Sequence, residues 1–119
     1  MPVQLHYEKC RLTACLSGEI DHHNAAGLRG EIDLALAKLH PPTLTLDFDG
    51  VTFMDSSAVG LVMGRYKLLC AFGGEMEVIN LSPVAYRMMQ LSGLQSLAKL
   101  RPKDSCQTSL AMEKERTQA

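Results

Sequence analysis

The residue types that could carry chemistry gather in two short stretches, Asp21-His22-His23 and Asp55-Ser56-Ser57. Together they contain the groups of a Ser-His-Asp hydrolase, and the histidine pair beside a carboxylate also suggests a metal site. The hydrolase interpretation fits poorly, because a nucleophile elbow needs G-x-S-x-G and Asp55 stands where its first glycine belongs. Adjacent histidines rarely reach one ion, and no second ligand cluster stands nearby in the sequence. We therefore expect no enzyme, no bound metal and no cofactor.

The second stretch lies where the periodicity of the sequence changes. Apolar residues alternate from Leu44 to Phe48, as in a strand, and recur at helical spacing from Val59 onward. Asp and Ser satisfy the free N–H groups of a first helical turn, so the triplet between these segments can act as a helix cap. If Ser56 is the cap, its replacement by Ala should cost roughly 1 kcal/mol of stability.

The same position also suits phosphorylation. A helix N-terminus attracts anions through its unpaired N–H groups and its dipole, so a serine there can hold a phosphoryl group without unfolding the helix. The sequence pattern alone does not decide between Ser56 and Ser57 as the acceptor.

Composition limits the classes of partner. The chain has 119 residues, 46% of them hydrophobic, which suits a single domain over 1–119. With 12 basic and 13 acidic residues it has no basic field that would attract nucleic acid or anionic lipid. Charged residues interrupt every apolar stretch before a membrane span is reached, so we expect a cytoplasmic protein. The 4 cysteines, including Cys106, form no C-x-x-C pair and are expected to be free thiols.

The N-terminal half predicts a hairpin and a helix. Alternating residues over 3–7 and 12–16 indicate two antiparallel strands. A helix is then predicted over 25–39, with Asn24 as its N-cap and an apolar stripe, and Pro41-Pro42 stops it. The stripe consists of Leu28, Ile32, Ala35, Leu36 and Leu39.

The central segment predicts a parallel βαβ unit. Its parts are the strand over 43–48, the helix that follows the triplet and ends at Gly73-Gly74, and a strand over 75–80. Gly60 and Gly64 stand four apart in that helix, which suggests close packing against the sheet.

The C-terminal part predicts a third helix, an edge strand and a short terminal helix. Ser82-Pro83 starts the third helix, Val84, Met88 and Leu91 form its apolar stripe, and Gly93 ends it. Leu97 and Leu100 suggest the edge strand, which Pro102 limits. Asp104 and Gln107 have capping-box spacing for the terminal helix, and a polar tail begins at about residue 114. The expected fold is therefore α/β, with a mixed four- to five-stranded sheet and about four helices.

Five blocks of sequence resemble the anti-sigma factor antagonists of the STAS-domain family. The similarity runs from about residue 5 to 100, and its blocks are 18–23 (GEIDHH), 53–60 (FMDSSAVG), 64–67 (GRYK), 73–76 (GGEM) and 91–94 (LSGL). Asp-His-His and Gly-Arg-Tyr-Lys resemble the sporulation members more than the general-stress members.

This resemblance implies a partner-switching protein. In that family the unphosphorylated antagonist binds an anti-sigma factor that is also a serine kinase, which holds ADP or ATP, and thereby frees the sigma factor. The kinase phosphorylates the antagonist with ATP, and a PP2C-type phosphatase reverses the modification. By resemblance, the sigma factor here is the sporulation factor sigma F. The alternatives are a general-stress-type antagonist and a STAS module that serves as a scaffold or binds a small molecule.

The resemblance also assigns roles to residues. Ser56 matches the phosphorylated serine, with Ser57 as the alternative, and Asp21 matches a position that faces the kinase. We expect the partner-binding surface to consist of Asp21, His22, Asp55, Ser57 and Ala58. Ala58 departs from the usual glycine of the family, so it is expected to stiffen the first turn and to add a methyl group beside the acceptor.

Overall fold

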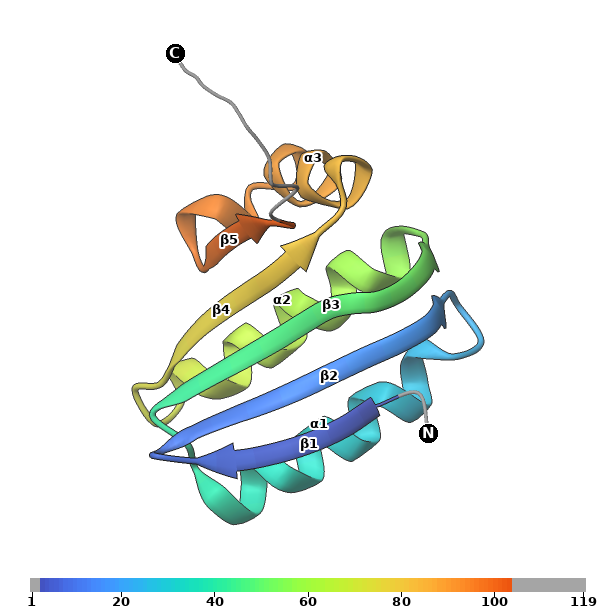
Figure 1. Ribbon diagram of the computed structural model, residues 1–119. Helices are drawn as coiled ribbons and strands as arrows, with labels where there is room; N and C mark the ends of the chain where they lie inside the picture. The colour runs from blue at the N-terminus through green and yellow to red at the C-terminus, as the bar shows by residue number, and fades with distance from the viewer. Residues whose placement is uncertain (1–2, 104–119) are drawn as a thin grey trace.

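The computed structural model describes residues 3–103, and these form a mixed five-stranded sheet with three α-helices and a 3-10 turn (Figure 1). The strands are β1 (Val3–Glu8), β2 (Arg11–Ile20), β3 (Thr43–Met54), β4 (Glu75–Leu81) and β5 (Lys99–Pro102). The helices are α1 (Ala25–Leu39), α2 (Ser56–Cys70) and α3 (Pro83–Leu91), and the 3-10 turn is η1 (Leu94–Ser96). The predicted terminal helix, the polar tail and Cys106 lie outside the described residues.

The sheet has the order β1-β2-β3-β4-β5. β1 and β2 pair in antiparallel fashion, whereas β2–β3, β3–β4 and β4–β5 are parallel. This arrangement confirms the predicted hairpin, the predicted βαβ unit and the α/β class. None of the helices among residues 3–103 is long and apolar enough to span a membrane.

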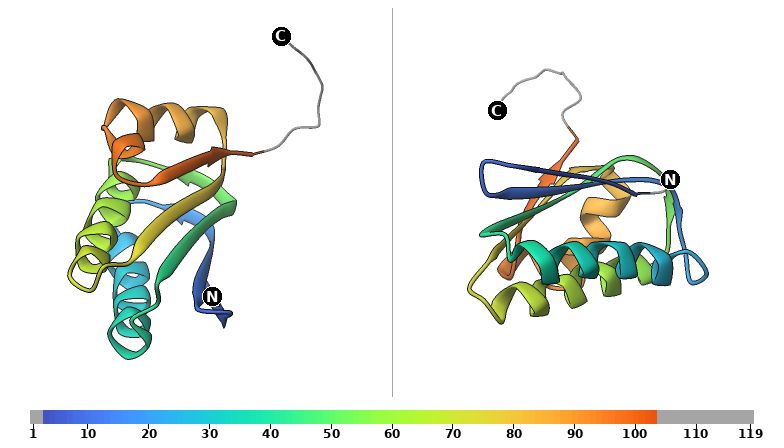
Figure 2. Two further views of the ribbon diagram at one scale, coloured as in Figure 1. Left: turned by 90° about the vertical axis from the view of Figure 1, so that its left-hand side faces the viewer. Right: turned by 90° about the horizontal axis from the view of Figure 1, so that it is seen from below.

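The core lies between one face of the sheet and helices α1 and α2, which cover that face side by side (Figure 2). Alternate residues of the strands point into it, including Leu12, Leu16, Leu44, Leu46 and Val78. The predicted stripe of α1 contributes Leu28, Ile32 and Leu36, all buried. The predicted core face of α1 is therefore confirmed except at the end of the stripe, where Leu39 is 39% exposed.

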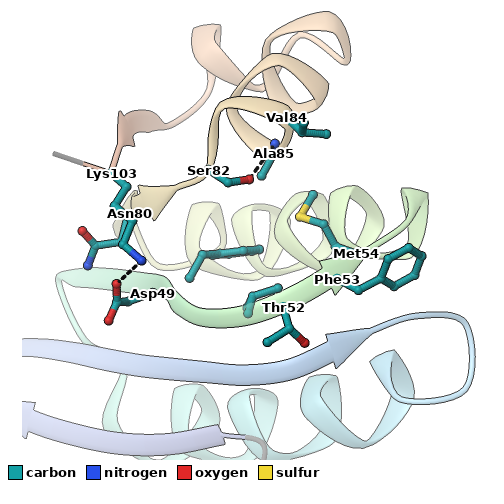
Figure 3. Close-up of a pocket in the computed structure, with 11 residues that line it drawn as sticks. Asp49, Thr52, Phe53, Met54, Asn80, Ser82, Val84, Ala85 and Lys103 are labelled. Carbon is teal, nitrogen blue, oxygen red and sulfur yellow. Dashed lines mark hydrogen bonds and ion pairs between the residues drawn. The ribbon is translucent and has the colours of Figure 1, made fainter. Parts of the chain in front are cut away.

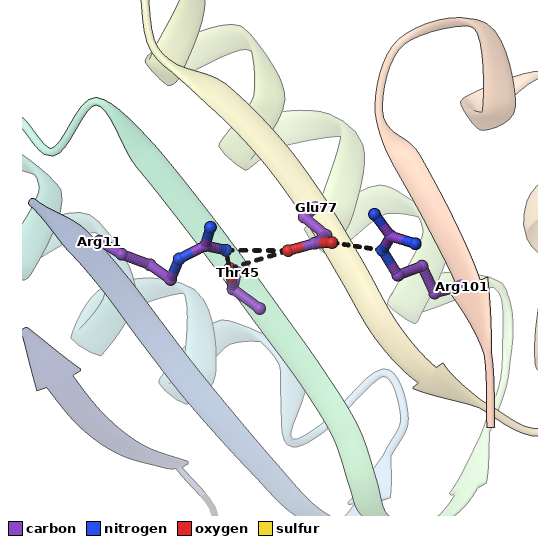
Figure 4. A network of polar contacts seen from close by, with 4 residues as sticks. All are labelled: Arg11, Thr45, Glu77 and Arg101. Carbon is purple, nitrogen blue, oxygen red and sulfur yellow. Dashed lines mark hydrogen bonds and ion pairs between the residues drawn. The ribbon is translucent and has the colours of Figure 1, made fainter. Parts of the chain in front are cut away.

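A polar network joins four strands on the other face of the sheet (Figure 4). Arg11 on β2 donates to Thr45 on β3 at 2.7 Å and pairs with Glu77 on β4 at 2.8 Å, and Glu77 also pairs with Arg101 on β5. Although partial burial raises the pKa of Glu77, hydrogen bonds from Arg101 and Arg11 bring it below its ordinary value. The network therefore links β2, β3, β4 and β5 on a face that no helix of residues 3–103 covers.

β3 is longer than predicted, because it continues beyond Phe48 to Met54. Its second half stays paired with β2, with register irregularities after Cys15 and Gly18. Gly50 permits this close approach, since a Cβ there would lie 2.9 Å from the Cβ of Ser17 and 3.0 Å from the carbonyl oxygen of Leu16. The extension carries the chain directly to the start of α2.

Two sequence interpretations of the helices were wrong. A Cβ at Gly60 or Gly64 would meet no atom within 4 Å, so these glycines do not bring α2 close to the sheet. In α3 the core face is formed by Ala85 and Met89, whereas Val84 is 73% and Leu91 77% exposed. A nine-residue helix carries two apolar stripes of similar length, so periodicity alone could not choose between them.

Arg65 of the Gly-Arg-Tyr-Lys motif is buried in α2 and pairs with Asp33 of α1. Its Nε lies 2.7 Å from the carboxylate, and its side chain is 6% exposed against 35% for Asp33. The contact is poorly aligned as a hydrogen bond, and within the described residues the Nη1 atom of Arg65 has no partner. Burial lowers the pKa of Arg65, while Asp33 opposes that change. Asp33 is therefore the compensating charge for this buried cation.

This ion pair gives a stability prediction. Asp33→Ala should lower the free energy of unfolding by about 2–3 kcal/mol, somewhat less than for a fully buried pair because Asp33 is partly exposed. Arg65→Met with Asp33→Ala should be closer to wild type than Asp33→Ala alone, since no unpaired charge then remains buried. Urea denaturation of the three proteins provides the measurement. A double mutant that is no more stable than the single mutant would show that Asp33 does not compensate Arg65.

Candidate functional site

The site predicted from the sequence lies where β2 and β3 end. The two strands are parallel, so both carboxyl ends meet at one edge of the sheet, where Ile20 pairs with Met54. The main-chain N–H of Asp55 donates to the carbonyl oxygen of Ile20 at 3.2 Å. The turn over 21–24 and the start of α2 are thereby held next to each other, although they are more than 30 residues apart in sequence.

Asp55 caps α2. Its backbone is extended (φ −115°, ψ −166°), and its Oδ1 atom accepts a hydrogen bond from the main-chain N–H of Ser57 at 2.8 Å. This bond is the main reason why the pKa of Asp55 lies below its ordinary value; partial desolvation opposes it, and the hydroxyl of Ser57 and His22 add to it. The carboxylate is therefore ionised at neutral pH. The cap therefore lies within the predicted Asp55-Ser56-Ser57 triplet, and Asp55, not Ser56, supplies the capping oxygen.

The three residues after Asp55 differ in accessibility. Ser56 is exposed, Ser57 is half-buried and Ala58 is fully buried. The amide and the hydroxyl of Ser57 both lower the pKa of Asp55. Within residues 3–103, by contrast, the hydroxyl of Ser56 makes no hydrogen bond to a protein atom. The methyl group of Ala58 points into the core, so it neither flanks the acceptor at the surface nor offers a partner its side chain. These facts favour Ser56 over Ser57 as the group that an enzyme could reach.

Asp21 fixes the turn between β2 and α1. Its Oδ1 atom accepts from the main-chain N–H groups of His23 at 3.0 Å and Asn24 at 2.9 Å. The predicted cap, Asn24, has helical backbone angles and instead donates from its side chain to the carbonyl oxygen of Glu19 at 3.1 Å. Asn24 therefore occupies the predicted N-cap position of α1, but within the described residues its side chain makes no capping hydrogen bond, and Asp21 forms an Asx turn just before the helix. Asp21 is therefore more than a solvated loop residue.

His22 joins this turn to the start of α2. Both His22 and His23 are exposed, and their rings meet edge to face with centroids 5.7 Å apart. The main-chain N–H and the imidazole of His22 both lower the pKa of Asp55. Residues 3–103 contain no group of three His, Cys, Asp or Glu side chains that could hold a metal ion.

A groove that the sequence interpretation missed lies beside the start of α2 (Figure 3). It has a volume of about 360 Å³ and runs between the end of β3, with Phe53 and Met54, and the start of α3, with Ser82 and Val84. Phe53 is 54% and Val84 is 73% exposed, so large apolar side chains line the groove from both sides at the surface. The only signal in the sequence was the position of Phe53, two residues before the capping residue Asp55.

Comparison with known proteins gives a consistent result. Residues 7–105 match the family model of the STAS domain. The chain is 35% identical over 94 residues to an anti-sigma F factor antagonist of Paenibacillus polymyxa, covering 79% of this chain and 80% of that protein.

Two solved structures show the same fold at useful sequence identity. The anti-sigma factor antagonist SpoIIAA in its unphosphorylated form aligns with TM-score 0.68 and 30% identity over 87% of this chain and 89% of that chain. The Bacillus cell fate determinant SpoIIAA in the phosphorylated form aligns with TM-score 0.67 and 34% identity over 82% and 89%. The family match, the relative and the shared fold agree, and the chain therefore belongs to the STAS-domain family, among its anti-sigma factor antagonists.

Proposed function

We propose that this protein is a partner-switching antagonist controlled by phosphorylation of Ser56. Unphosphorylated, it binds an anti-sigma factor serine kinase carrying ADP or ATP and releases the sporulation sigma factor, sigma F. Phosphorylation ends this binding, and a PP2C-type phosphatase restores it. The similarity to the anti-sigma F factor antagonist and to a relative solved in a phosphorylated form supports this proposal. Such a switch would operate in the cytoplasm, with the protein as substrate and not as enzyme.

One structural observation supports this function most directly: the capping residue and the exposed serine are different residues. Asp55 satisfies the N–H of Ser57, so Ser56 is free to be modified without loss of the cap. A phosphoryl group at the first helical residue meets the positive end of the helix dipole. The fold can therefore persist in both states of the switch.

The surface proposed to face the kinase surrounds Ser56. Its polar part consists of Asp21, His22, Asp55 and the rim of Ser57, and its apolar part consists of Phe53 and Val84. Phosphorylation adds a charge of about −1.5 to −2 in the middle of this surface. In a docked complex that charge would lose its water beside the carboxylate of Asp55, so binding should collapse while the fold survives.

Two alternative functions are compatible with the same structure. A general-stress-type antagonist would differ only in its cognate kinase and sigma factor. A STAS module that binds a small molecule is favoured by the groove of about 360 Å³ between the end of β3 and the start of α3. Binding to the immobilised kinase with ADP, compared before and after treatment with ATP, separates partner switching from both scaffolding and small-molecule binding.

The first prediction from this proposed function concerns the site of phosphorylation. Incubation with the cognate kinase and ATP should add a single phosphoryl group, because only Ser56 of the pair combines exposure with a free hydroxyl. Phosphopeptide mapping by mass spectrometry should place it on Ser56, and Ser56→Ala should abolish it. Modification of Ser57, or retention of the signal in Ser56→Ala, would contradict this assignment.

The second prediction separates signalling from helix capping. Ser56→Ala should change stability by less than about 0.5 kcal/mol, since Asp55 is the cap, and it should bind the kinase even after treatment with ATP. Ser56→Asp should be as stable as wild type, because a negative charge at a helix N-terminus is favourable, yet it should bind the kinase weakly.

Asp55→Ala is the matched control, since it should cost about 1 kcal/mol through loss of the cap. Calorimetric stability and kinase affinity measured on the same samples give the comparison. If kinase affinity simply follows stability across Ser56→Ala, Ser56→Asp and Asp55→Ala, then Asp55 and Ser56 have only a structural role.

The third prediction concerns Asp21, which has a structural contact as well as a proposed place on the kinase-binding surface. Because Asp21 closes the Asx turn, Asp21→Ala should cost about 1 kcal/mol of stability as well as kinase affinity. Asp21→Asn keeps an acceptor oxygen and removes the charge, so it should retain most of the stability and still lose affinity. Equal affinity of Asp21→Asn and wild type would show that the carboxylate charge does not face the kinase.

A further inference from the structure

We propose that His22 supplies the counter-charge for the phosphoryl group on Ser56, as a positioning residue of the phosphorylated state. This inference rests on the proposed function, because it concerns the state that the switch creates. It adds a specific intramolecular partner for the phosphate, which the capping geometry does not supply by itself.

The backbone fixes His22 at the required place. His22 follows Ile20 by two residues, Ser56 follows Met54 by two residues, and Ile20 and Met54 are paired across neighbouring strands. Paired strands lie about 4.8 Å apart. The main-chain N–H of Asp55 also donates to the carbonyl oxygen of Ile20 at 3.2 Å, so the turn with His22 and the helix start with Ser56 leave the same edge of the sheet side by side. The turn that carries His22 is rigid, since Asp21 and Asn24 each anchor it by side-chain hydrogen bonds.

None of the ion pairs in the described part of the chain involves His22. The basic residues that form ion pairs in the described part of the chain serve other carboxylates: Arg65 pairs with Asp33, Arg11 and Arg101 with Glu77, and Lys103 with Asp49. His22 is the basic side chain that acts on Asp55, directly before Ser56. The titratable neighbours of His22 are His23 and Asp21 in its own turn, Glu19 at the end of β2, and Asp55 on the helix side.

The chemistry of the two groups makes the contact dependent on pH. The second ionisation of a phosphoserine lies near a pH of about 6, and a histidine is the side chain that changes charge in the same range. A protonated imidazole donates N–H groups to phosphate oxygens and favours the doubly charged phosphate. A contact between the phosphate on Ser56 and a histidine should therefore weaken as the pH rises through this range.

The test uses the full chain with phosphoserine encoded genetically at position 56, so that no kinase is needed. Phosphorus NMR follows the phosphate through its second ionisation between pH 5 and pH 8. His22→Gln should raise the titration midpoint by about 0.3 pH units or more, because the neighbouring cation that favours the dianion is lost. The difference should shrink at about 0.5 M salt, as expected for an exposed charge pair.

His23→Gln is the matched control, since His23 stands one residue away in the same turn and should leave the midpoint unchanged. Thermal denaturation of the unphosphorylated variants verifies that both fold. Equal midpoints for wild type and His22→Gln, or a larger shift for His23→Gln, would overturn the assignment. Failure of the kinase to modify Ser56 would instead contradict the proposed function and leave this titration result unaffected.

Discussion

The hydrogen bond from the main-chain N–H of Ser57 to the carboxylate of Asp55 is the interaction on which the site depends. It begins α2 at Ser56, and it does so with a residue that precedes the helix, so the first helical side chain carries no structural task. The same aspartate is tied through its own N–H to Ile20 at the end of β2. One residue therefore sets both the start of the helix and its position beside the neighbouring turn.

The rest of the fold holds in place the edge of the sheet where β2 and β3 end. Apolar side chains lie between the sheet and helices α1 and α2, while the opposite face is joined by the network of Arg11, Thr45, Glu77 and Arg101. A parallel sheet places the carboxyl ends of β2 and β3 together whatever residues follow them. Site residues from two distant segments can thus meet without a long loop, and a change of charge at Ser56 need not be transmitted through the core.

The sequence predicted the elements better than their local contacts. Periodicity over α1 and over the βαβ unit was unambiguous, because each segment is long and buries one face. It failed for α3, whose nine residues carry an exposed apolar stripe through Val84 and Leu91 beside a buried one through Ala85 and Met89. The side chains that make the hydrogen bonds at the two helix starts were not predicted, for a different reason. Capping propensity ranks Asp, Ser and Asn almost equally, and only the backbone path decides which of them reaches the free N–H groups.

The proposed partnership between His22 and the phosphate bears on how such a switch can be strong without a conformational change. In the free protein a histidine beside Ser56 would offset part of the added charge, so the phosphorylated form costs little in stability. In a complex the same histidine would have to be desolvated together with the phosphate and Asp55, and an exposed pair that is weak in water offers little compensation for that loss. The fold would then tolerate the phosphoryl group, while the partner would reject it. Both effects come from the solvation of the charged groups at this edge of the sheet.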